Sequence, residues 1–338
     1  MIHLENGYLM GFGAALIIGL LITPLFGKLS MKLGIIDYPS RRRFHLTSMP
    51  MLGGLAIAST FIIVLLIISR GKPGTQLAAI MASSVLLLIL GLIDDINSIS
   101  PPVKLGGQFV AGIILIAGGL QVRMSGVPVI DYVLTFIWVA GIVNCLNLLD
   151  NIDGLAGGTS AIAGCFFFIA ALMTGKAELA VAAAVFTGSC LGFLFHNFHP
   201  ASIFSGDAGS MFMGGILAAF GMSFMEQGNI VSHLYPGVIL GMLIFDTGLV
   251  TVMRIRSSTS ITQGGKDHTS HRLCYLGMSV QGAVTTIFIA CALFGFAGVS
   301  MISLSKAYAI LLTLALLFIS FFCWYLMRNL YDYTRRKA

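Results

Sequence analysis

Apolar runs of about 20 residues follow one another along nearly the whole chain, and they constrain its fold more than any other feature. A helix needs about that many apolar residues to cross a bilayer. Charged residues make up only 9% of the 338 residues, and hydrophobic residues make up 57%. Soluble domains carry about 25% charged residues, so this chain has too little polar surface to coat a water-soluble globule. The sequence therefore predicts an all-α, polytopic membrane protein that forms a single domain over residues 1–338.

We expect eleven transmembrane helices, of which the fourth and the seventh are the weakest. They lie near residues 8–27, 52–69, 76–93, 105–121, 129–149, 155–174, 179–195, 209–226, 235–253, 278–300 and 305–327. Because this number is odd, the two ends of the chain lie on opposite sides of the membrane. Fourteen of the 19 lysine and arginine residues fall on one side, and short loops rich in these residues stay in the cytoplasm. The N-terminus is therefore predicted to lie outside and the C-terminus in the cytoplasm.

The acidic residues are distributed as unevenly as the basic ones. Nine of the 13 fall on the predicted cytoplasmic side, although carboxylates have little influence on orientation. Most of the nine lie at the ends of apolar runs, where a carboxylate is costly and usually functional. We expect an active site for a charged, metal-bound substrate on the cytoplasmic face, formed by loops near residues 28–51, 94–104, 150–154, 196–208 and 254–277.

The third apolar run ends in two adjacent carboxylates, Asp94 and Asp95. Two such charges at a membrane edge repel each other and need a cation or a shared proton nearby. One interpretation is a solvated helix end. The functional interpretation is a catalytic pair that organises a metal ion or removes a proton from an attacking oxygen.

Polar residues also interrupt the end of the fifth run. Asn144 and Asn147 share one helical face, and Asp150 and Asp153 are also three residues apart. Amides in an apolar helix end are costly unless they are paired or bind something. Glycines follow from Gly154 onward, and they permit a tight turn and the close approach of a ligand. The pattern favours a binding site over a purely structural turn.

The segment before the eighth run reads Phe204-Ser-Gly206-Asp207-Ala-Gly-Ser210, and it follows Asn197 closely. Backbone N–H groups at a helix start, together with one carboxylate, can hold a diphosphate and its Mg²⁺. Alone this pattern is weak. Beside the other carboxylates it predicts a phosphate and metal site around Gly206 and Asp207.

Two further cytoplasmic segments contain histidine and arginine. The last loop holds His268, His271 and Arg272, without the additional ligands that a zinc site needs. Hydrogen bonding to phosphate or sugar is therefore favoured there. The first loop carries three arginines before His45, and membrane topology alone also explains their charge. Asp246 lies inside the ninth run, where hydrogen bonding between helices is a better interpretation than catalysis.

Five motifs in this order match a known family. They are Asp37-x-Pro with Arg-Arg-x-His45 and Pro50-x-x-Gly53-Gly54, Asp94-Asp95, Lys104-x-x-x-Gln108, Asn144 with Asp150-x-x-Asp153-Gly154, and Gly206-Asp207-x-Gly209-Ser210. Over nearly its whole length the chain resembles the polyprenyl-phosphate N-acetylhexosamine-1-phosphate transferases, which include WecA, TagO and MraY. Any one motif can arise by chance, whereas five in order are highly specific.

The resemblance implies Mg²⁺-dependent transfer of a sugar-1-phosphate from a UDP-sugar to undecaprenyl phosphate with release of UMP, with Mn²⁺ as a substitute metal. It implies that Asp207 is a metal ligand and Asn147 a second one. It also implies that Asp94, beside Asp95, deprotonates the lipid phosphate. The remaining expected substrate-binding residues are Phe204, which would stack on uracil, Lys104 as a phosphate partner, and His45, Asn144, Asp150, Asp153, Asn197, Gly206, His268, His271 and Arg272.

The spacing of the histidines in the last loop is closer to the WecA/TagO branch than to the clustered histidines of MraY. UDP-GlcNAc is therefore the expected donor, in the first membrane step of a cell-envelope glycan pathway such as lipopolysaccharide or teichoic acid synthesis. An MraY-type transferase with a muramyl-pentapeptide donor is the alternative within the family. A transporter is the alternative outside it, although transporters place ionisable groups near the membrane midplane. We expect a multi-pass protein of the inner (plasma) membrane without a nucleic-acid partner, and a homodimer is left open.

Overall fold

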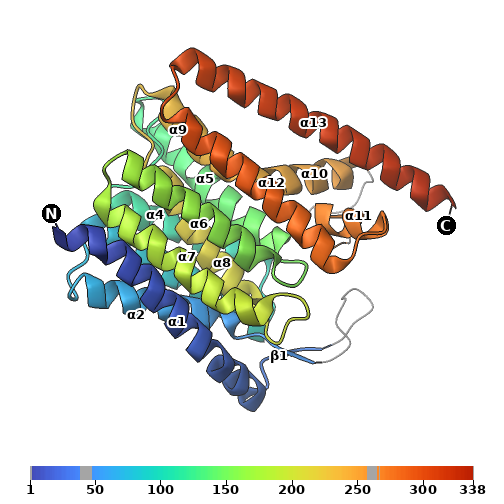
Figure 1. Cartoon of the computed structure of the whole chain (residues 1–338), viewed down its shortest axis with the longest axis horizontal. Helices are drawn as coiled ribbons and strands as arrows, with labels where there is room; N and C mark the ends of the chain where they lie inside the picture. Colours follow the sequence, from blue (N-terminus) through green and yellow to red (C-terminus); the bar gives the residue numbers. More distant parts are fainter. Residues whose placement is uncertain (1, 39–47, 257–264, 266, 338) are drawn as a thin grey trace.

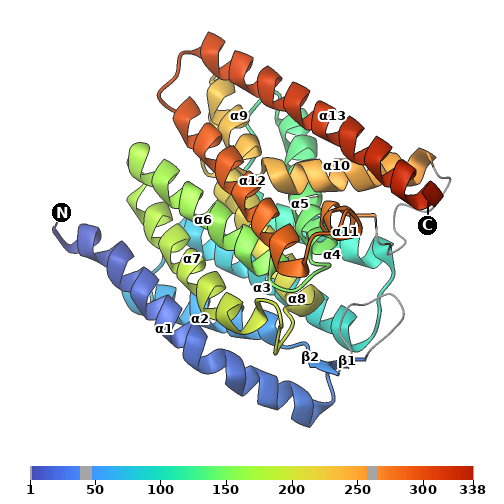
Figure 2. The same cartoon turned by 45° about the vertical axis from the view of Figure 1, so that its right-hand side comes forward.

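The structure of the protein is a computed structural model that describes residues 2–38, 48–256, 265 and 267–337. These residues form thirteen helices and one two-stranded antiparallel sheet (Figure 1, Figure 2). The helices are α1 (Ile2–Leu33), α2 (Gly53–Ile68), α3 (Thr75–Ile96), α4 (Pro101–Ala117), α5 (Pro128–Leu149), α6 (Leu155–Met173), α7 (Ala177–Asn197), α8 (Gly206–Met222), α9 (Ile230–Ile239), α10 (Gly241–Arg256), α11 (Thr269–Tyr275), α12 (Val280–Met301) and α13 (Lys306–Lys337). The strands are β1 (Ile36–Asp37) and β2 (Met49–Pro50), and they lie between α1 and α2.

Each of the eleven apolar runs contains at least one helix, so the expected all-α, polytopic architecture is confirmed. Seven of the described helices are long and apolar enough to cross a membrane, or eight if α9 and α10 form one broken span. The helices α2 and α4 are shorter, with 16 and 17 residues, and α8 also has 17. The expected total of eleven crossings therefore stays a prediction.

The ninth run differs from the expectation of one span over residues 235–253. It forms two helices, α9 and α10, whose axes differ by 72°. Pro236 lies inside α9 and removes one backbone N–H from the helix. Gly241 begins α10 directly after the bend, and glycine has a low helix propensity. The helix continues through Pro236 to Ile239, so Gly241 is the residue that favours the break at this point.

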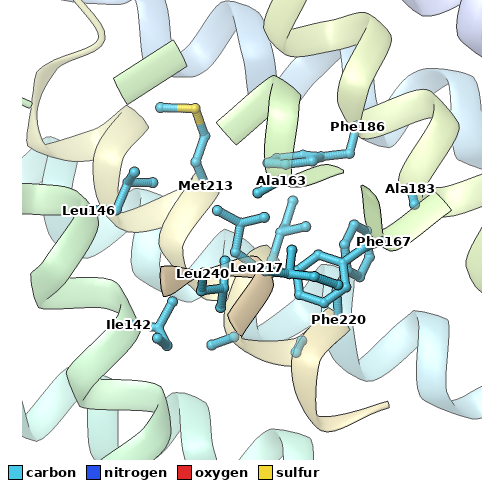
Figure 3. Packing of buried hydrophobic residues seen from close by; sticks show 14 of the residues in the cluster. Ile142, Leu146, Ala163, Phe167, Ala183, Phe186, Met213, Leu217, Phe220 and Leu240 are labelled. Carbon is cyan, nitrogen blue, oxygen red and sulfur yellow. The ribbon is translucent and has the colours of Figure 1, made fainter. Parts of the chain in front are cut away.

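The centre of the bundle is α8, which packs against α2, α3, α5 and α6 (Figure 2). Every residue from Ala208 to Met222 is buried, as expected for a helix that is apolar on all sides. Figure 3 shows Met213, Leu217 and Phe220 of α8 among side chains of α5, α6 and α7. Asp207 is the one residue of α8 that is not buried. The helix thus carries a single accessible carboxylate at its N-terminus.

The outer helices expose apolar side chains. α13 lies along the outside of the bundle (Figure 1), and none of its most apolar stretch is buried. Leu311, Phe318 and Phe321 are among its exposed residues. Such a surface is stable in lipid, where exposed apolar side chains carry no hydration cost.

Candidate active site

The N-terminus of α8 is held by a carboxylate from α3. The backbone N–H of Asp207 donates to Oδ1 of Asp95 at 2.8 Å, and the N–H of Ala208 donates to Oδ2 at 3.1 Å. The first N–H groups of a helix have no partner within it and carry a partial positive charge. Asp95 therefore caps α8 from a neighbouring helix with both of its oxygens. It positions Asp207, and its expected part in catalysis stays a prediction.

Lys104, in the first turn of α4, joins two of the expected site residues. Its Nζ lies 2.5 Å from Oδ2 of Asp94 and 2.5 Å from Oδ2 of Asp207. The other oxygen of Asp94 accepts a hydrogen bond from the N–H of Ile99 at 2.8 Å. The three side chains carry a net charge of −1 when all are ionised. The cluster can therefore attract a further cation.

Two glycines allow α3 and α8 to approach this closely. Gly206 has a φ of +68°, which favours glycine, and a Cβ there would collide with the carboxylate of Asp95. A Cβ on Gly91 would collide with the backbone carbonyl of Asp207. Gly206 thus belongs to the site through its backbone, and its expected contact with substrate stays a prediction.

The Pro50-x-x-Gly53-Gly54 motif holds the segment that leads into α8. The N–H groups of Gly53 and Gly54 donate to the carbonyls of Phe204 and Ser205, both at 2.9 Å. The N–H of Phe204 donates in turn to the carbonyl of Pro50 at 2.8 Å. The ring of Phe204 is half-buried. The backbone of Phe204 is fixed by these hydrogen bonds to Pro50 and Gly53. The expected stacking of its ring on uracil stays a prediction.

The two asparagines at the end of α5 face different neighbours. The Nδ2 of Asn144 donates to Oε1 of Gln108 at 3.0 Å, and Nε2 of Gln108 donates to Oδ1 of Asn144 at 3.2 Å. Asn144 therefore joins α5 to α4. The Nδ2 of Asn147 donates to Oγ of Ser210 on the first turn of α8 at 2.8 Å. Within the described residues, Oδ1 of Asn147 accepts no hydrogen bond.

The aspartates of the turn after α5 bind the loop between α7 and α8. Asp150 accepts a hydrogen bond from Oγ of Ser205 at 2.6 Å. The Oδ2 of Asp153 accepts from the N–H of Ala201 at 3.1 Å and lies 2.8 Å from Nδ1 of His199. Ser205 is two residues before Asp207, so Asp150 lies near the start of α8. Lys104 joins Asp94 to Asp207. The three aspartates therefore lie at the same end of the bundle.

Asn197 joins the same two loops from the inside. Its Oδ1 accepts a hydrogen bond from the N–H of Gly154 at 3.0 Å, and its Nδ2 donates to the carbonyl of Ile203 at 2.8 Å. The side chain is buried. In the structure Asn197 orders the two loops, and its expected contact with a nucleotide stays a prediction.

The short helix α11 places His268, His271 and Arg272 beside the turn after α5. The Oγ of Ser270 donates to Oδ1 of Asn151 at 2.6 Å. All three expected residues are buried or nearly so, and the ring centroids of the two histidines lie 5.9 Å apart. The contact through Asn151 joins α11 to the end of the bundle that carries Asp150.

An ion pair fixes the segment before α11. The guanidinium of Arg254 donates to both oxygens of Asp267, at 2.8 and 2.9 Å, and Nε of Arg272 donates to the backbone carbonyl of Asp267 at 2.8 Å. Burial would raise the pKa of Asp267, but the hydrogen bonds and charge of Arg254 outweigh it and hold the pKa below its usual value. Asp267 thus stays ionised and anchors both arginines.

Metal binding is consistent with the donors around Asp207. Within the part of the chain that the structure describes, no group of three or more His, Cys, Asp or Glu side chains is arranged to hold a metal ion. Magnesium, however, commonly uses one or two carboxylates and takes its other oxygens from phosphates and water. The carboxylate of Asp207 and the amide oxygen of Asn147 are hard oxygen donors of this kind. These residues fit Mg²⁺ better than Zn²⁺. The expected site residue His45 lies outside the described residues.

Sequence reasoning missed several residues that orient the expected ones. Ser205 and Ser210 flank or end the Gly-Asp-x-Gly-Ser motif, so the motif itself contained a signal for them. Gln108 belonged to a motif but received no role. Asn151 also received no role, and it binds Ser270 of α11. Asp246 was expected to hydrogen-bond between helices and does so with the start of α11, but no spacing in the sequence identified that partner.

Known proteins resemble this chain over most of its length. A family described as glycosyl transferase family 4 matches residues 77–225. A probable undecaprenyl-phosphate N-acetylglucosaminyl 1-phosphate transferase of Bacillus subtilis is 35% identical over 324 residues, which cover 92% of this chain and 88% of the relative. A decaprenyl-phosphate N-acetylglucosaminephosphotransferase of Mycobacterium leprae is 33% identical, with 87% of this chain and 83% of the relative covered.

A more distant relative belongs to the other branch. The phospho-N-acetylmuramoyl-pentapeptide-transferase of Halalkalibacterium halodurans is 29% identical over 260 residues, which cover 69% of this chain and 78% of the relative. The matched range 77–225 contains Asp94, Asp95, Asp150, Asp153 and Asp207. Together, the identity to the Bacillus protein and its coverage of both chains establish that this chain belongs to the polyprenyl-phosphate N-acetylhexosamine-1-phosphate transferase family.

Proposed function

We propose that the protein transfers N-acetylglucosamine-1-phosphate from UDP-GlcNAc to undecaprenyl phosphate, which gives undecaprenyl-diphosphate-GlcNAc and UMP. The names of the Bacillus and Mycobacterium relatives support the sugar and a polyprenyl phosphate acceptor. The observation that carries the proposal is the cluster of Asp94, Lys104 and Asp207 at the N-terminus of a buried helix. Such a cluster, with a net negative charge and a lysine at its centre, suits a diphosphate that binds together with a divalent cation.

In the proposed reaction an oxygen of the lipid phosphate attacks the β-phosphorus of the UDP-sugar. The bond from that phosphorus to the oxygen bridging the two phosphates breaks, and UMP leaves with this oxygen. Asp94 would accept the proton of a monoprotonated lipid phosphate. Lys104 lies between Asp94 and Asp207 and would donate to the phosphate oxygens as their charge changes. Asp95 keeps α8 in place during the transfer.

A direct displacement agrees better with the geometry than a route through a phosphorylated aspartate. Both oxygens of Asp95 are engaged by backbone N–H groups, and those of Asp94 by Ile99 and Lys104. A nucleophilic carboxylate would have to give up one of these contacts. Phosphoryl transfer also depends mainly on positioning and charge stabilisation, which the cluster supplies without a covalent intermediate.

The proposed metal is Mg²⁺, with Mn²⁺ as a substitute, and Asp207 and Asn147 are its proposed protein ligands. When bound, it would neutralise charge on the diphosphate and on the departing UMP. Asp207 is accessible at the start of α8, and Asn147 is tied to the same turn through Ser210.

The proposed orientation places this end of the bundle at the cytoplasmic face of the inner (plasma) membrane. Eleven crossings, with the N-terminus outside and the C-terminus in the cytoplasm, agree with fourteen of 19 lysine and arginine residues on that side. The seven long apolar helices of the described residues support a multi-pass protein.

The decisive experiment measures UMP release by the purified protein with undecaprenyl phosphate and Mg²⁺. We expect release with UDP-GlcNAc, accompanied by a lipid-linked sugar product, and no release after chelation of the metal. A panel of UDP-sugars tests the donor. Release with UDP-MurNAc-pentapeptide alone would support the MraY-type alternative, to which the name of the Halalkalibacterium relative corresponds. No release with any donor would overturn the proposed function.

Replacing Phe204 by alanine should weaken the binding of UDP by about 1–3 kcal/mol, because a base–aromatic stack would be lost. The backbone at Phe204 is held by Pro50 and Gly53, so the loop should keep its shape. Calorimetric titration with UDP measures the change. The control is Phe195→Ala, since that ring is largely exposed near the end of α7. Equal losses in both variants, or none in Phe204→Ala, would show that another group holds the uracil.

A further inference from the structure

Asp246 is a fully buried carboxylate in the middle of α10. One oxygen lies 2.8 Å from Nδ1 of His268, and the other accepts a hydrogen bond from the backbone N–H of Thr269 at 2.7 Å. Both oxygens therefore bind the start of α11, 22 and 23 residues further along the chain. A buried carboxylate is stable only when such donors satisfy it.

The contact between Asp246 and His268 leaves one ring nitrogen available for another partner. A nitrogen that donates to a carboxylate must carry a proton, so Nδ1 is committed to Asp246. Nε2 has no hydrogen-bond partner among the described residues. The side chain of His268 is almost entirely buried, so the protein around it holds the ring in place. His268 thus presents one nitrogen in a fixed direction.

Other contacts place this nitrogen on the same side as the candidate active site. Ser270 binds Asn151 in the turn after α5, and Asp150 of that turn binds Ser205. Arg254 and Asp267 fix the segment before α11. The start of α11 is therefore attached to the end of the bundle that carries Asp150 and Asp207.

We propose that Asp246 is a positioning residue of the transferase: it orients His268 so that Nε2 can bind the diphosphate-sugar donor. With Nδ1 held by Asp246, Nε2 is the ring nitrogen that remains to contact the donor. This inference rests on the proposed function, because it assigns Asp246 a task in that reaction. The two hydrogen bonds of Asp246 confirm the expected link between helices, and the inference adds a task to that link.

A double-mutant cycle tests this inference. The variants are Asp246→Asn, His268→Gln and the double variant, each assayed for kcat and KM with UDP-GlcNAc and for thermal unfolding in detergent. Loss of the partner that orients a functional histidine typically costs about 10- to 100-fold. We expect Asp246→Asn to show this loss with the same division between kcat and KM as His268→Gln. The double variant should be no worse than His268→Gln, because two residues that act through one group are not additive.

The matched control is Asp131→Asn, at the opposite end of α5. Asp131 is also buried and accepts hydrogen bonds from Met124 and Ser125, but it lies far along α5 from Asp150. Its loss should lower the unfolding temperature and leave kcat and KM unchanged. If Asp246→Asn fails to fold, Asp246→Glu takes its place in the cycle, since it keeps the charge and displaces the carboxylate.

The inference would be overturned if the fold-losses of activity of the two single variants multiplied in the double variant. Full activity of Asp246→Asn would overturn it too. Full activity of His268→Gln would overturn it as well, and the proposed function would still stand if the wild-type protein releases UMP. Failure of the proposed function is recognised separately, as absence of UMP release by the wild-type protein with every donor.

Discussion

Replacing Asp207 by asparagine is expected to lower turnover by at least about 10³-fold, since one preorganised charge-stabilising group alone contributes about 10²–10³-fold. Asparagine keeps the shape of the side chain, and the backbone N–H of residue 207 still donates to Asp95. The variant loses the negative charge that would hold the proposed metal ion, and it loses one of the two carboxylate partners of Lys104. The measurement is the initial rate of UMP release at saturating UDP-GlcNAc, together with thermal unfolding in the same detergent.

Glu226→Gln is the control for this variant. Glu226 is an exposed carboxylate beyond the other end of α8, where it lies 3.9 Å from Lys176. Its loss should leave turnover within about twofold, as usual for surface substitutions. A folded Asp207→Asn protein with near-normal turnover would remove Asp207 from both the metal site and the reaction.

Replacing Lys104 by glutamine is expected to lower activity and, at the same time, to tighten metal binding. In the wild-type protein the ammonium group of Lys104 offsets part of the negative charge of Asp94 and Asp207. A unit charge about 4 Å away contributes about 4 kcal/mol at an effective dielectric constant of 20, and the partial exposure of these side chains reduces this. We expect Mn²⁺ to bind the substrate-free variant about tenfold more tightly, which corresponds to about 1.4 kcal/mol. Turnover should fall by about 10²-fold, because a phosphate partner is lost.

Electron paramagnetic resonance of Mn²⁺ measures this affinity without substrate and without turnover. The unfolding temperature of Lys104→Gln should also rise more steeply with Mn²⁺ than that of the wild type, since a ligand stabilises the state that binds it. Lys176→Gln is the control, because Lys176 pairs with Glu226 at the opposite end of the bundle. Unchanged or weaker Mn²⁺ binding by Lys104→Gln would show that the ammonium and the metal do not compete.

Sequence periodicity and composition were sufficient for the membrane architecture, because each apolar run forms a helix. They were insufficient for the bend between α9 and α10. A hydropathy window averages over Pro236 and Gly241, whereas a helix breaks at individual residues. The number of crossings is similarly undetermined, since α2, α4 and α8 are short for a bilayer.

The candidate site was predictable as a set of residues and only partly as a set of roles. The motifs located Asp94, Lys104 and Asp207, which the structure brings together. The same motifs did not separate residues with free donor atoms from residues such as Asn197, whose amide is used within the protein. Hydrogen-bond partners distant in sequence decide this difference, and a single sequence without contacts does not contain them.

The complete enclosure of α8 has a consequence for motion during turnover. A helix that is surrounded by side chains cannot slide or rotate unless the neighbouring side chains repack. A densely packed interior resists such repacking. Rearrangements that admit the nucleotide or release UMP therefore belong to helices outside this core, such as α10 and α11, which pack mainly against α5 and α12. Substitutions that change the speed of product release without altering the carboxylates should accordingly map to those two outer helices.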